Sequence, residues 1–320
     1  MAINKAMKLA LKALSYSKLD LEQSRKLLNL KTIDPLKRLY DRVDQKIYNG
    51  DYAVPIRIYR SKKSMTTLNT PVILFLHGGG WVTESVDTYN RICKNLAFKT
   101  GQLVISVDYR LAPEYTFPTA LEDCYAVARE LFVKHSFNIN PDNITLVGDS
   151  AGGNLVASLS LLARDRGEFL PKRQILIYPC VNSDFSEAAP YPSVIENGTD
   201  YLLTREKMAD YVDMYKSSDE DLQNPYFAPI LTKDFSNQPR TLIVTAEFDP
   251  LRDEGEAYGR KLREAGNEVD IYRISDALHG FFSLSTRHFH VKELFIYIRG
   301  FLNEEVNDDK KQENKMETIR

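Results

Sequence analysis

The stretch from Ile144 to Asn154 restricts the possible folds of this chain more than any other part of it. It begins with a short apolar run, passes through a Gly-x-Ser-x-Gly pattern at residues 148–152, and continues into a helix-forming segment. This order predicts a strand, a tight turn and a helix, with the hydroxyl of Ser150 raised above the edge of a sheet. The pattern also occurs by chance, so its meaning depends on partner residues elsewhere in the chain.

The composition is that of a globular protein with almost no net charge. Of 320 residues, 43% are hydrophobic, which suits one large α/β domain with a smaller accessory layer. The 42 basic and 44 acidic residues leave a net charge of -2, which favours neither nucleic acid nor an anionic membrane. No apolar run is long enough to span a bilayer, and lysines interrupt the N-terminal apolar stretch. We therefore expect a cytoplasmic protein without nucleic-acid partners or stable membrane insertion.

Strand-like and helical segments alternate along most of the chain. This alternation predicts an α/β fold with a mainly parallel, doubly wound sheet and helices on both faces. A hairpin around Asn49-Gly50-Asp51 begins the sheet. The later strands are expected at residues 72–76, 103–107, 144–149, 174–178, 240–246 and 268–274.

Two segments depart from the alternation, and we expect them to form a helical cap. Residues 1–45 are helical in pattern, and residues 183–227 are too long for an ordinary connection. The sheet domain would then comprise residues 46–182 and 228–302. Residues 303–320 are charged and lack aromatics, which predicts a solvated, mobile tail.

A serine nucleophile needs a base and an acid that orients the base. His279 follows the last expected strand, near the edge where Ser150 should project, and the other four histidines are placed less well. Asp249 follows the strand at 240–246 and is the favoured acid, although the pattern also suits a helix cap. Asp276 is the competing acid, with less freedom to reach the imidazole from the same loop.

The glycines at positions 78–80 follow a buried strand and would let backbone amides approach a substrate carbonyl. The amide of Ala151, at the start of the helix after Ser150, would join them. A glycine run could also hold phosphate, but no helix start or lysine completes such a motif here. Trp81, directly after the run, either lines the pocket or packs in the core.

Five motifs of this chain resemble those of the hormone-sensitive lipase family of α/β-hydrolases, which includes bacterial carboxylesterases and arylacetamide deacetylases. The resemblance covers residues 46–302. The motifs occur in the family's order: HGGGW at 77–81, DYRLAPE at 108–114, GDSAGG at 148–153, DPLRDEG at 249–255 and HGF at 279–281.

The resemblance implies an α/β-hydrolase fold with a helical cap, and neither a metal nor another cofactor. It assigns Ser150 as the nucleophile, Asp249 as the acid and His279 as the base. In the DYRLAPE motif, Arg110 and Glu114 are expected to form a structural ion pair. The amides of an oxyanion hole would come from Gly79, Gly80 and Ala151.

The leading functional expectation is a serine carboxylesterase that hydrolyses small, short-chain acyl esters, such as acetyl esters, through an acyl-enzyme. The alternative is an amidase or deacetylase acting on aryl or acetylated small molecules. A non-catalytic receptor is disfavoured, because the plant gibberellin receptors that resemble this family have lost the histidine and this chain keeps His279. Trp81 and Tyr201 are the predicted substrate-binding residues, and a homodimer is compatible with the sequence.

Overall fold

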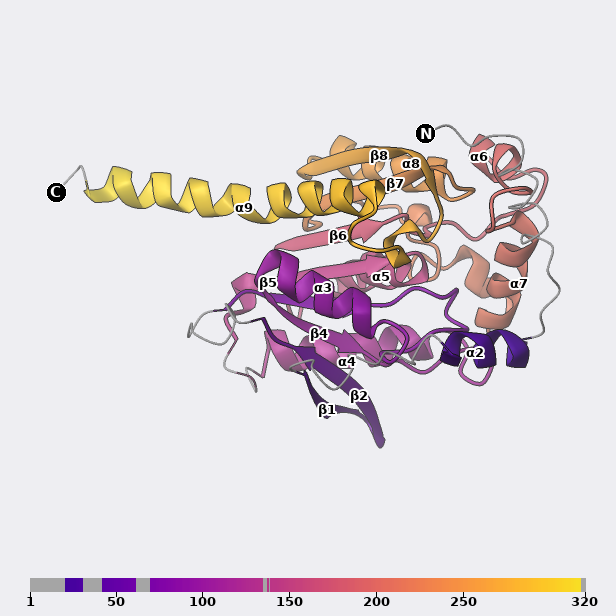
Figure 1. The fold of residues 1–320 in the computed structure, drawn as a ribbon, viewed down its shortest axis with the longest axis horizontal. Coiled ribbons are helices and arrows are strands. Elements are labelled where there is room, and N and C mark those ends of the chain that lie inside the picture. Colours follow the sequence, from indigo (N-terminus) through magenta and orange to yellow (C-terminus); the bar gives the residue numbers. More distant parts are fainter. Residues whose placement is uncertain (1–20, 31–41, 62–69, 135–136, 138, 318–320) are drawn as a thin grey trace.

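The computed structural model describes residues 21–30, 42–61, 70–134, 137 and 139–317. In this part of the chain, one eight-stranded sheet has the strand order β1-β2-β4-β3-β5-β6-β7-β8 (Figure 1). The β1/β2 and β2/β4 pairs are antiparallel, and all other neighbours are parallel. The strands are β1 (Arg42–Asn49), β2 (Tyr52–Tyr59), β3 (Val72–Leu76), β4 (Leu103–Val107), β5 (Ile144–Asp149), β6 (Arg173–Ile177), β7 (Arg240–Phe248) and β8 (Val269–Leu278).

Helices cover both faces of this sheet. Alternate residues of β3 enter different cores: Leu74 packs with residues of α4, α5 and α8, and Phe75 packs with residues of α3 and α9. Burial on both faces explains why the central strands are continuous apolar runs in the sequence. The helices are α2 (Leu21–Leu30), α3 (Asn90–Thr100), α4 (Thr119–Phe132), α5 (Ala151–Arg166), α6 (Pro192–Glu196), α7 (Arg205–Tyr215), α8 (Arg252–Glu264) and α9 (Phe289–Glu317), with short 3-10 turns η2 (Pro141–Asn143), η3 (Asp219–Gln223), η4 (Pro229–Leu231) and η5 (Phe281–Ser283).

This architecture confirms the predicted α/β-hydrolase fold class, with two corrections at the ends. The sheet begins at Arg42, inside the segment 1–45 that was expected to be helical. The β1/β2 pairing extends from Asn49 opposite Tyr52 to Arg42 opposite Tyr59, so residues 42–45 belong to the hairpin. Helix α2 is the other described part of that segment, and the helix expected around residues 3–14 lies outside the described residues.

The second correction concerns the expected tail at 303–320. Helix α9 does not end near residue 301 but continues to Glu317, and Figure 1 shows its last turns projecting beyond the sheet. Glu, Lys and Gln are good helix formers and no proline interrupts the segment, so a helix already begun at Phe289 can propagate through it.

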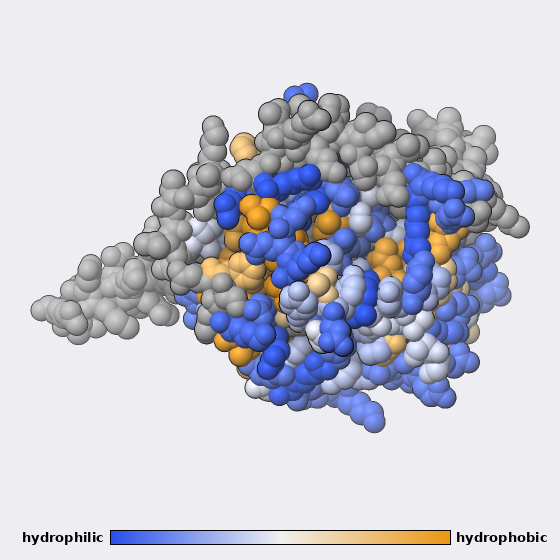
Figure 2. All heavy atoms as spheres, turned by 90° about the horizontal axis from the view of Figure 1, so that it is seen from below, coloured by the Kyte–Doolittle hydropathy of each residue, from blue (hydrophilic) through white to orange (hydrophobic). Residues whose placement is uncertain are grey.

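The visible surface is mostly polar, and the three cysteines lie inside the protein. On the face seen from below, most of the coloured residues are hydrophilic, with several separate apolar patches among them (Figure 2). None of the described helices combines the length and apolar character needed to cross a bilayer. The three cysteines, Cys93, Cys124 and Cys180, are buried, and burial raises the pKa of the Cys93 thiol to about 12.

Candidate active site

The turn between β5 and α5 holds Ser150 in a strained backbone conformation. Its φ is 55° and its ψ is -121°, a region that a residue with a side chain rarely adopts. The neighbouring glycines permit the turn: a Cβ on Gly148 would lie 2.2 Å from the carbonyl oxygen of Gly152, and one on Gly152 would lie 2.0 Å from that of Leu76. The predicted strand, turn and helix are therefore all present, with Ser150 at the point where they meet.

Two distant loops bring an imidazole and a carboxylate to Ser150. His279 follows β8, and its Nε2 lies 2.9 Å from the Oγ of Ser150. Asp249 follows β7, and its Oδ2 lies 2.7 Å from Nδ1 of the same ring. The carboxylate of Asp249 is fully buried and also accepts a hydrogen bond from the amide of Leu251 at 2.9 Å. The three residues form a continuous chain of hydrogen-bonding groups from a buried carboxylate to a hydroxyl.

Asp276 does not hold the position that Asp249 holds at Nδ1. Its backbone is in the left-handed region, with a φ of 58°, and its amide donates to Oε2 of Glu247 at 2.7 Å. Of the two candidate acids, Asp249 is the one hydrogen-bonded to His279, and its role as the catalytic acid stays a prediction.

The glycine loop (residues 78–80) packs against the start of α5. The carbonyl oxygens of Leu76 and His77, directly before the loop, are within 2.6 Å of the place where a Cβ on Gly152 would stand. A Cβ on Gly78 would lie 2.9 Å from the carbonyl oxygen of Asp149, so the loop itself lies against the turn that leads into α5. Within the described part of the chain, several amides in this region donate no hydrogen bond to another residue, and three of them are those predicted to bind an oxyanion. These are the amides of Gly79, Gly80 and Ala151.

A second buried carboxylate, which the sequence analysis did not single out, lies behind the serine. Asp149 accepts hydrogen bonds from the amide of Gly78 at 3.0 Å, from Tyr89 Oη at 2.9 Å and from Tyr178 Oη at 3.2 Å. The ring of Tyr178 lies 4.7 Å from that of His279. Burial raises the pKa of Asp149 to about 6 against the opposing effect of these hydrogen bonds. One side chain thus connects the glycine loop with the ring that packs on the histidine.

The two predicted substrate-binding aromatics make packing contacts. Trp81 is 1% exposed and stacks on Tyr215 of α7, with ring centroids 4.6 Å apart. Tyr201 is 9% exposed and stacks on Phe248, 5.0 Å away. Contact of either ring with a substrate stays a prediction.

A cleft of about 530 Å³ lies between α2 and α7. The ring of Tyr211 sits directly on the glycine loop, because a Cβ on Gly80 would lie 2.6 Å from a ring carbon. Tyr211 therefore links the cleft to the loop that carries the free amides. The cleft is lined by Leu21, Ser24, Thr83, Lys207, Asp210, Tyr211, Asp213 and Met214.

Arg25 joins helix α2 to the sheet domain by several hydrogen bonds. Its Nε donates to the carbonyl of Val82 at 2.9 Å, and its Nη2 donates to that of Ala112 at 2.8 Å. Its guanidinium also pairs with Glu114 at 2.6 Å, which lowers the pKa of that carboxyl to about 2. Arg25 thereby joins α2 to the segment after the glycine loop and to the DYRLAPE segment.

The expected ion pair between Arg110 and Glu114 is wrong. Arg110 binds the fully buried carboxylate of Asp123 at 2.7 Å, and Glu114 is taken by Arg25. The sequence placed the two charges in one motif, but each pairs with a residue from another element.

Glu254 is a buried acid next to the loop that follows β6. Its Oε1 accepts hydrogen bonds from the amides of Val181 at 2.8 Å and Asn182 at 3.1 Å. Its Oε2 has no hydrogen-bond partner among the described residues. Burial, helped by the charges of Asp249 and Asp253, raises the pKa of Glu254 to about 8.

We expect Glu254→Gln to remove a pH-dependent loss of stability. Because the native pKa of about 8 lies above the ordinary 4.5, the unfolded chain releases this proton first as the pH rises. The free energy of unfolding of the wild type should therefore fall, relative to the variant, by on the order of a few kcal/mol between about pH 5 and pH 8. Glutamine keeps the acceptor for both amides and has no proton to lose. Denaturant titrations at both pH values measure this, and a constant difference would contradict it.

Comparison with known proteins gives the relatives of the chain. A family model described as alpha/beta hydrolase fold matches residues 73–283. An arylesterase of Saccharolobus solfataricus is 41% identical over 240 residues, 74% of this chain and 76% of the relative. An ethyl acetate hydrolase of Pseudomonas putida is 35% identical over 237 residues, 73% of each chain. The solved structure of a hyperthermophilic esterase from the archaeon Pyrobaculum calidifontis has a TM-score of 0.84 and 33% identity, covering 96% of this chain and 99% of that one.

The fold and these relatives define an α/β-hydrolase. With its five motifs in order, the chain belongs to the hormone-sensitive lipase family of these hydrolases, as the sequence predicted. Among the described residues, no group of three or more His, Cys, Asp or Glu side chains is arranged to hold a metal ion.

Proposed function

We propose that this protein is a serine carboxylesterase that hydrolyses small esters of short acyl groups through an acyl-enzyme. The observation that carries the proposal is the hydrogen-bonded chain from Asp249 through His279 to Ser150, with distances of 2.7 and 2.9 Å. The names of the relatives support this choice, since they include an arylesterase and an ethyl acetate hydrolase.

In the proposed reaction, the Oγ of Ser150 attacks the ester carbonyl while Nε2 of His279 takes the hydroxyl proton. The buried carboxylate of Asp249 stabilises the resulting imidazolium. The free amides of Gly79, Gly80 and Ala151 would bind the oxyanion, and a single such donor contributes about 10²- to 10³-fold to turnover in other hydrolases.

When the tetrahedral intermediate collapses, the carbon–oxygen bond to the leaving alcohol breaks and His279 returns its proton to that oxygen. Water then attacks the acyl-enzyme, with His279 as the base once more. The second intermediate expels the Oγ of Ser150, which recovers its proton, and releases the carboxylic acid. The cycle consumes one water molecule and needs no cofactor.

We further propose that α2, α6 and α7 belong to a cap over this site. The supporting observations are the position of the 530 Å³ cleft between α2 and α7 and the contact of Tyr211 with Gly80. In this proposal the described part of the cap comprises residues 21–30 and 183–227, and the start of β1 belongs to the sheet domain. A cytoplasmic location and a homodimer stay predictions.

A chain-length series of nitrophenyl esters, together with a nitroanilide, tests the proposed function. We expect kcat/KM to be highest for acetyl and butyryl esters and to fall at least about tenfold for long acyl chains. The cleft wall carries the charged groups of Lys207, Asp210 and Asp213, so it gains little from a long apolar chain. Faster hydrolysis of the anilide than of the matched ester would favour the amidase alternative.

A further inference from the structure

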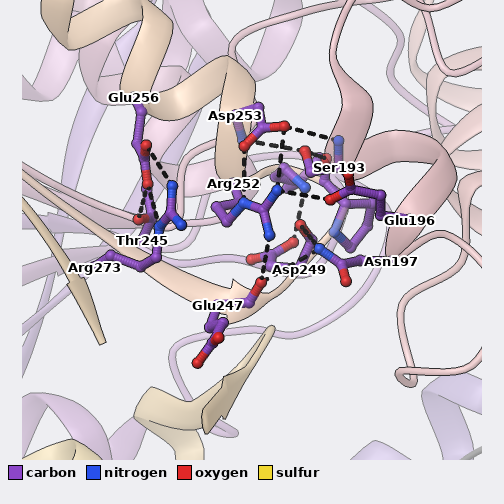
Figure 3. A network of polar contacts seen from close by, with 12 residues as sticks. Ser193, Glu196, Asn197, Thr245, Glu247, Asp249, Arg252, Asp253, Glu256 and Arg273 are labelled. Carbon is purple, nitrogen blue, oxygen red and sulfur yellow. Dashed lines mark hydrogen bonds and ion pairs between the residues drawn. The ribbon is translucent and has the colours of Figure 1, made fainter. Parts of the chain in front are cut away.

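Helix α6 is bonded to the backbone of the loop that carries Asp249 (Figure 3). The Nδ2 of Asn197, at the C-terminal end of α6, donates to the carbonyl oxygens of both Glu247 and Asp249, at 3.3 Å each. The Oγ of Ser193, at its other end, donates to the carbonyl of Pro250 at 2.8 Å. A five-residue helix from the segment 183–227 therefore binds three carbonyls in four consecutive residues of the acid loop (residues 247–250).

Arg252 also joins α6 to the acid loop (Figure 3). Its Nη1 donates to the carbonyl of Glu247 at 3.1 Å, and its Nη2 pairs with Glu196 of α6 at 3.0 Å. Its Nε pairs with Asp253, whose second carboxylate oxygen accepts from the amide of Ser193 at 2.8 Å. The carbonyl of Glu247 is thus held by an amide side chain and by a guanidinium at once.

The sheet fixes this part of the backbone less firmly than it fixes the strand before it. The β7/β8 ladder shifts its register between Ala246 and Phe248, just before Asp249. The stacking of Tyr201 on Phe248, at 5.0 Å with an interplanar angle of 16°, adds a contact from the 183–227 segment at that point. The position of the acid is therefore set by α6 and its following residues as well as by β7.

We propose that Asn197 is a positioning residue for the triad acid. It is 4% exposed, and by binding the carbonyls on both sides of Phe248 it fixes the backbone from which the Asp249 carboxylate reaches His279. This role rests on the proposed function, since it matters only if Asp249 orients a catalytic base. It also makes the C-terminal end of α6, where Asn197 lies, a fixed support of the acid, in contrast to a mobile lid.

The test is a double-mutant cycle of Asn197→Asp and Asp249→Asn. Aspartate keeps the shape of asparagine but replaces its donor by an acceptor that faces two carbonyl oxygens. The measured quantity is the rate constant for labelling of Ser150 by a nitrophenyl phosphonate, followed by mass spectrometry, which remains measurable when turnover is very slow. For the two proteins of the cycle that keep Asp249, steady-state kcat and KM for nitrophenyl acetate are measured as well.

We expect Asn197→Asp to lower labelling and kcat by about 10- to 100-fold with little change in KM, because a small misplacement of a catalytic group is costly. With Asp249→Asn already present, the same change should have less than about a twofold effect, since there is no acid left to position. If Asn197→Asp lowers the labelling rate by the same factor with and without Asp249→Asn, the proposal is overturned. Asn197→Ser, which keeps one donor, replaces Asn197→Asp if the latter does not fold, and its expected loss is smaller.

Ser193→Ala is the matched control for stability. It removes two hydrogen bonds of α6, the one that Ser193 Oγ donates to the carbonyl of Pro250 and the one that it accepts from the amide of Asp253, but leaves the carbonyls of Glu247 and Asp249 bonded. It should lower Tm to a similar extent while changing the labelling rate less than about twofold. Labelling that persists in Ser150→Ala would reject the proposed function itself, whereas Ser150-dependent labelling without coupling rejects only the role of Asn197.

Discussion

Replacing Ser150 by alanine is expected to abolish ester hydrolysis, with a fall in kcat of about 10⁵-fold or more. The substitution removes the attacking oxygen and leaves the remaining machinery in place. The protein should still fold, because alanine keeps the Cβ that the turn already accommodates, and the Oγ contacts Nε2 of His279 at the rim of the site. Nitrophenyl acetate hydrolysis and a thermal melt of both proteins measure the two expectations.

Organophosphate treatment tests the same assignment by the appearance of a covalent adduct on the nucleophile. The wild type should gain one adduct, on the tryptic peptide that contains Ser150, and Ser150→Ala should gain none. An adduct on another residue, or hydrolysis that survives in the variant, would show that the nucleophile lies elsewhere.

Asp249→Asn is expected to lower kcat by about 10⁴-fold, equivalent to 4 to 5 kcal/mol of transition-state stabilisation, with little change in KM. Asparagine can keep its oxygen toward the amide of Leu251, but its NH₂ group then faces Nδ1 of His279. The imidazole would have to accept at Nδ1 and carry its proton on Nε2. In that tautomer Nε2 cannot take the proton of Ser150. Steady-state kinetics, with a circular dichroism spectrum to establish folding, measure this effect.

Asp276→Asn serves as the matched control, because it makes the same chemical change three residues before His279. The contact that Asp276 makes through its amide with Glu247 does not depend on its side chain. We expect less than about a threefold change in kcat. If Asp276→Asn proves the more damaging of the two with both proteins folded, the triad must be redrawn with Asp276 as its acid.

The sequence predicts the parts of this fold that depend on local patterns. The central strands are recognisable because burial on both faces requires continuous apolar runs, and the turn at Ser150 because only glycine fits at positions 148 and 152. The three residues of the proposed triad could be found because each follows a predicted strand, and the ends of parallel strands meet at one edge of a sheet.

Contacts between distant side chains could not be predicted in the same way. Nothing local distinguishes Asp123 from Glu114 as the partner of Arg110, and the choice falls to Asp123 only because α4 brings it to the motif in the folded chain. The contacts of Asn197 likewise join segments 50 and 52 residues apart. The length of helix α9 was underestimated for another reason. Its C-terminal segment is charged and has no apolar stripe that would predict a helix, but such a segment can extend a helix already formed.

The buried carboxylate of Asp149 supports the glycine loop and the tyrosine ring on His279 through contacts that do not involve the cleft between α2 and α7. It holds Gly78 and Tyr178 from inside the sheet domain, whereas the cleft wall is built from α2 and α7. Little reorganisation of the glycine loop should then be needed when a substrate arrives, whatever its acyl group. If the proposed cap holds the substrate, substitutions at positions such as Leu21 and Met214 are expected to change which ester is accepted while the reaction chemistry is preserved.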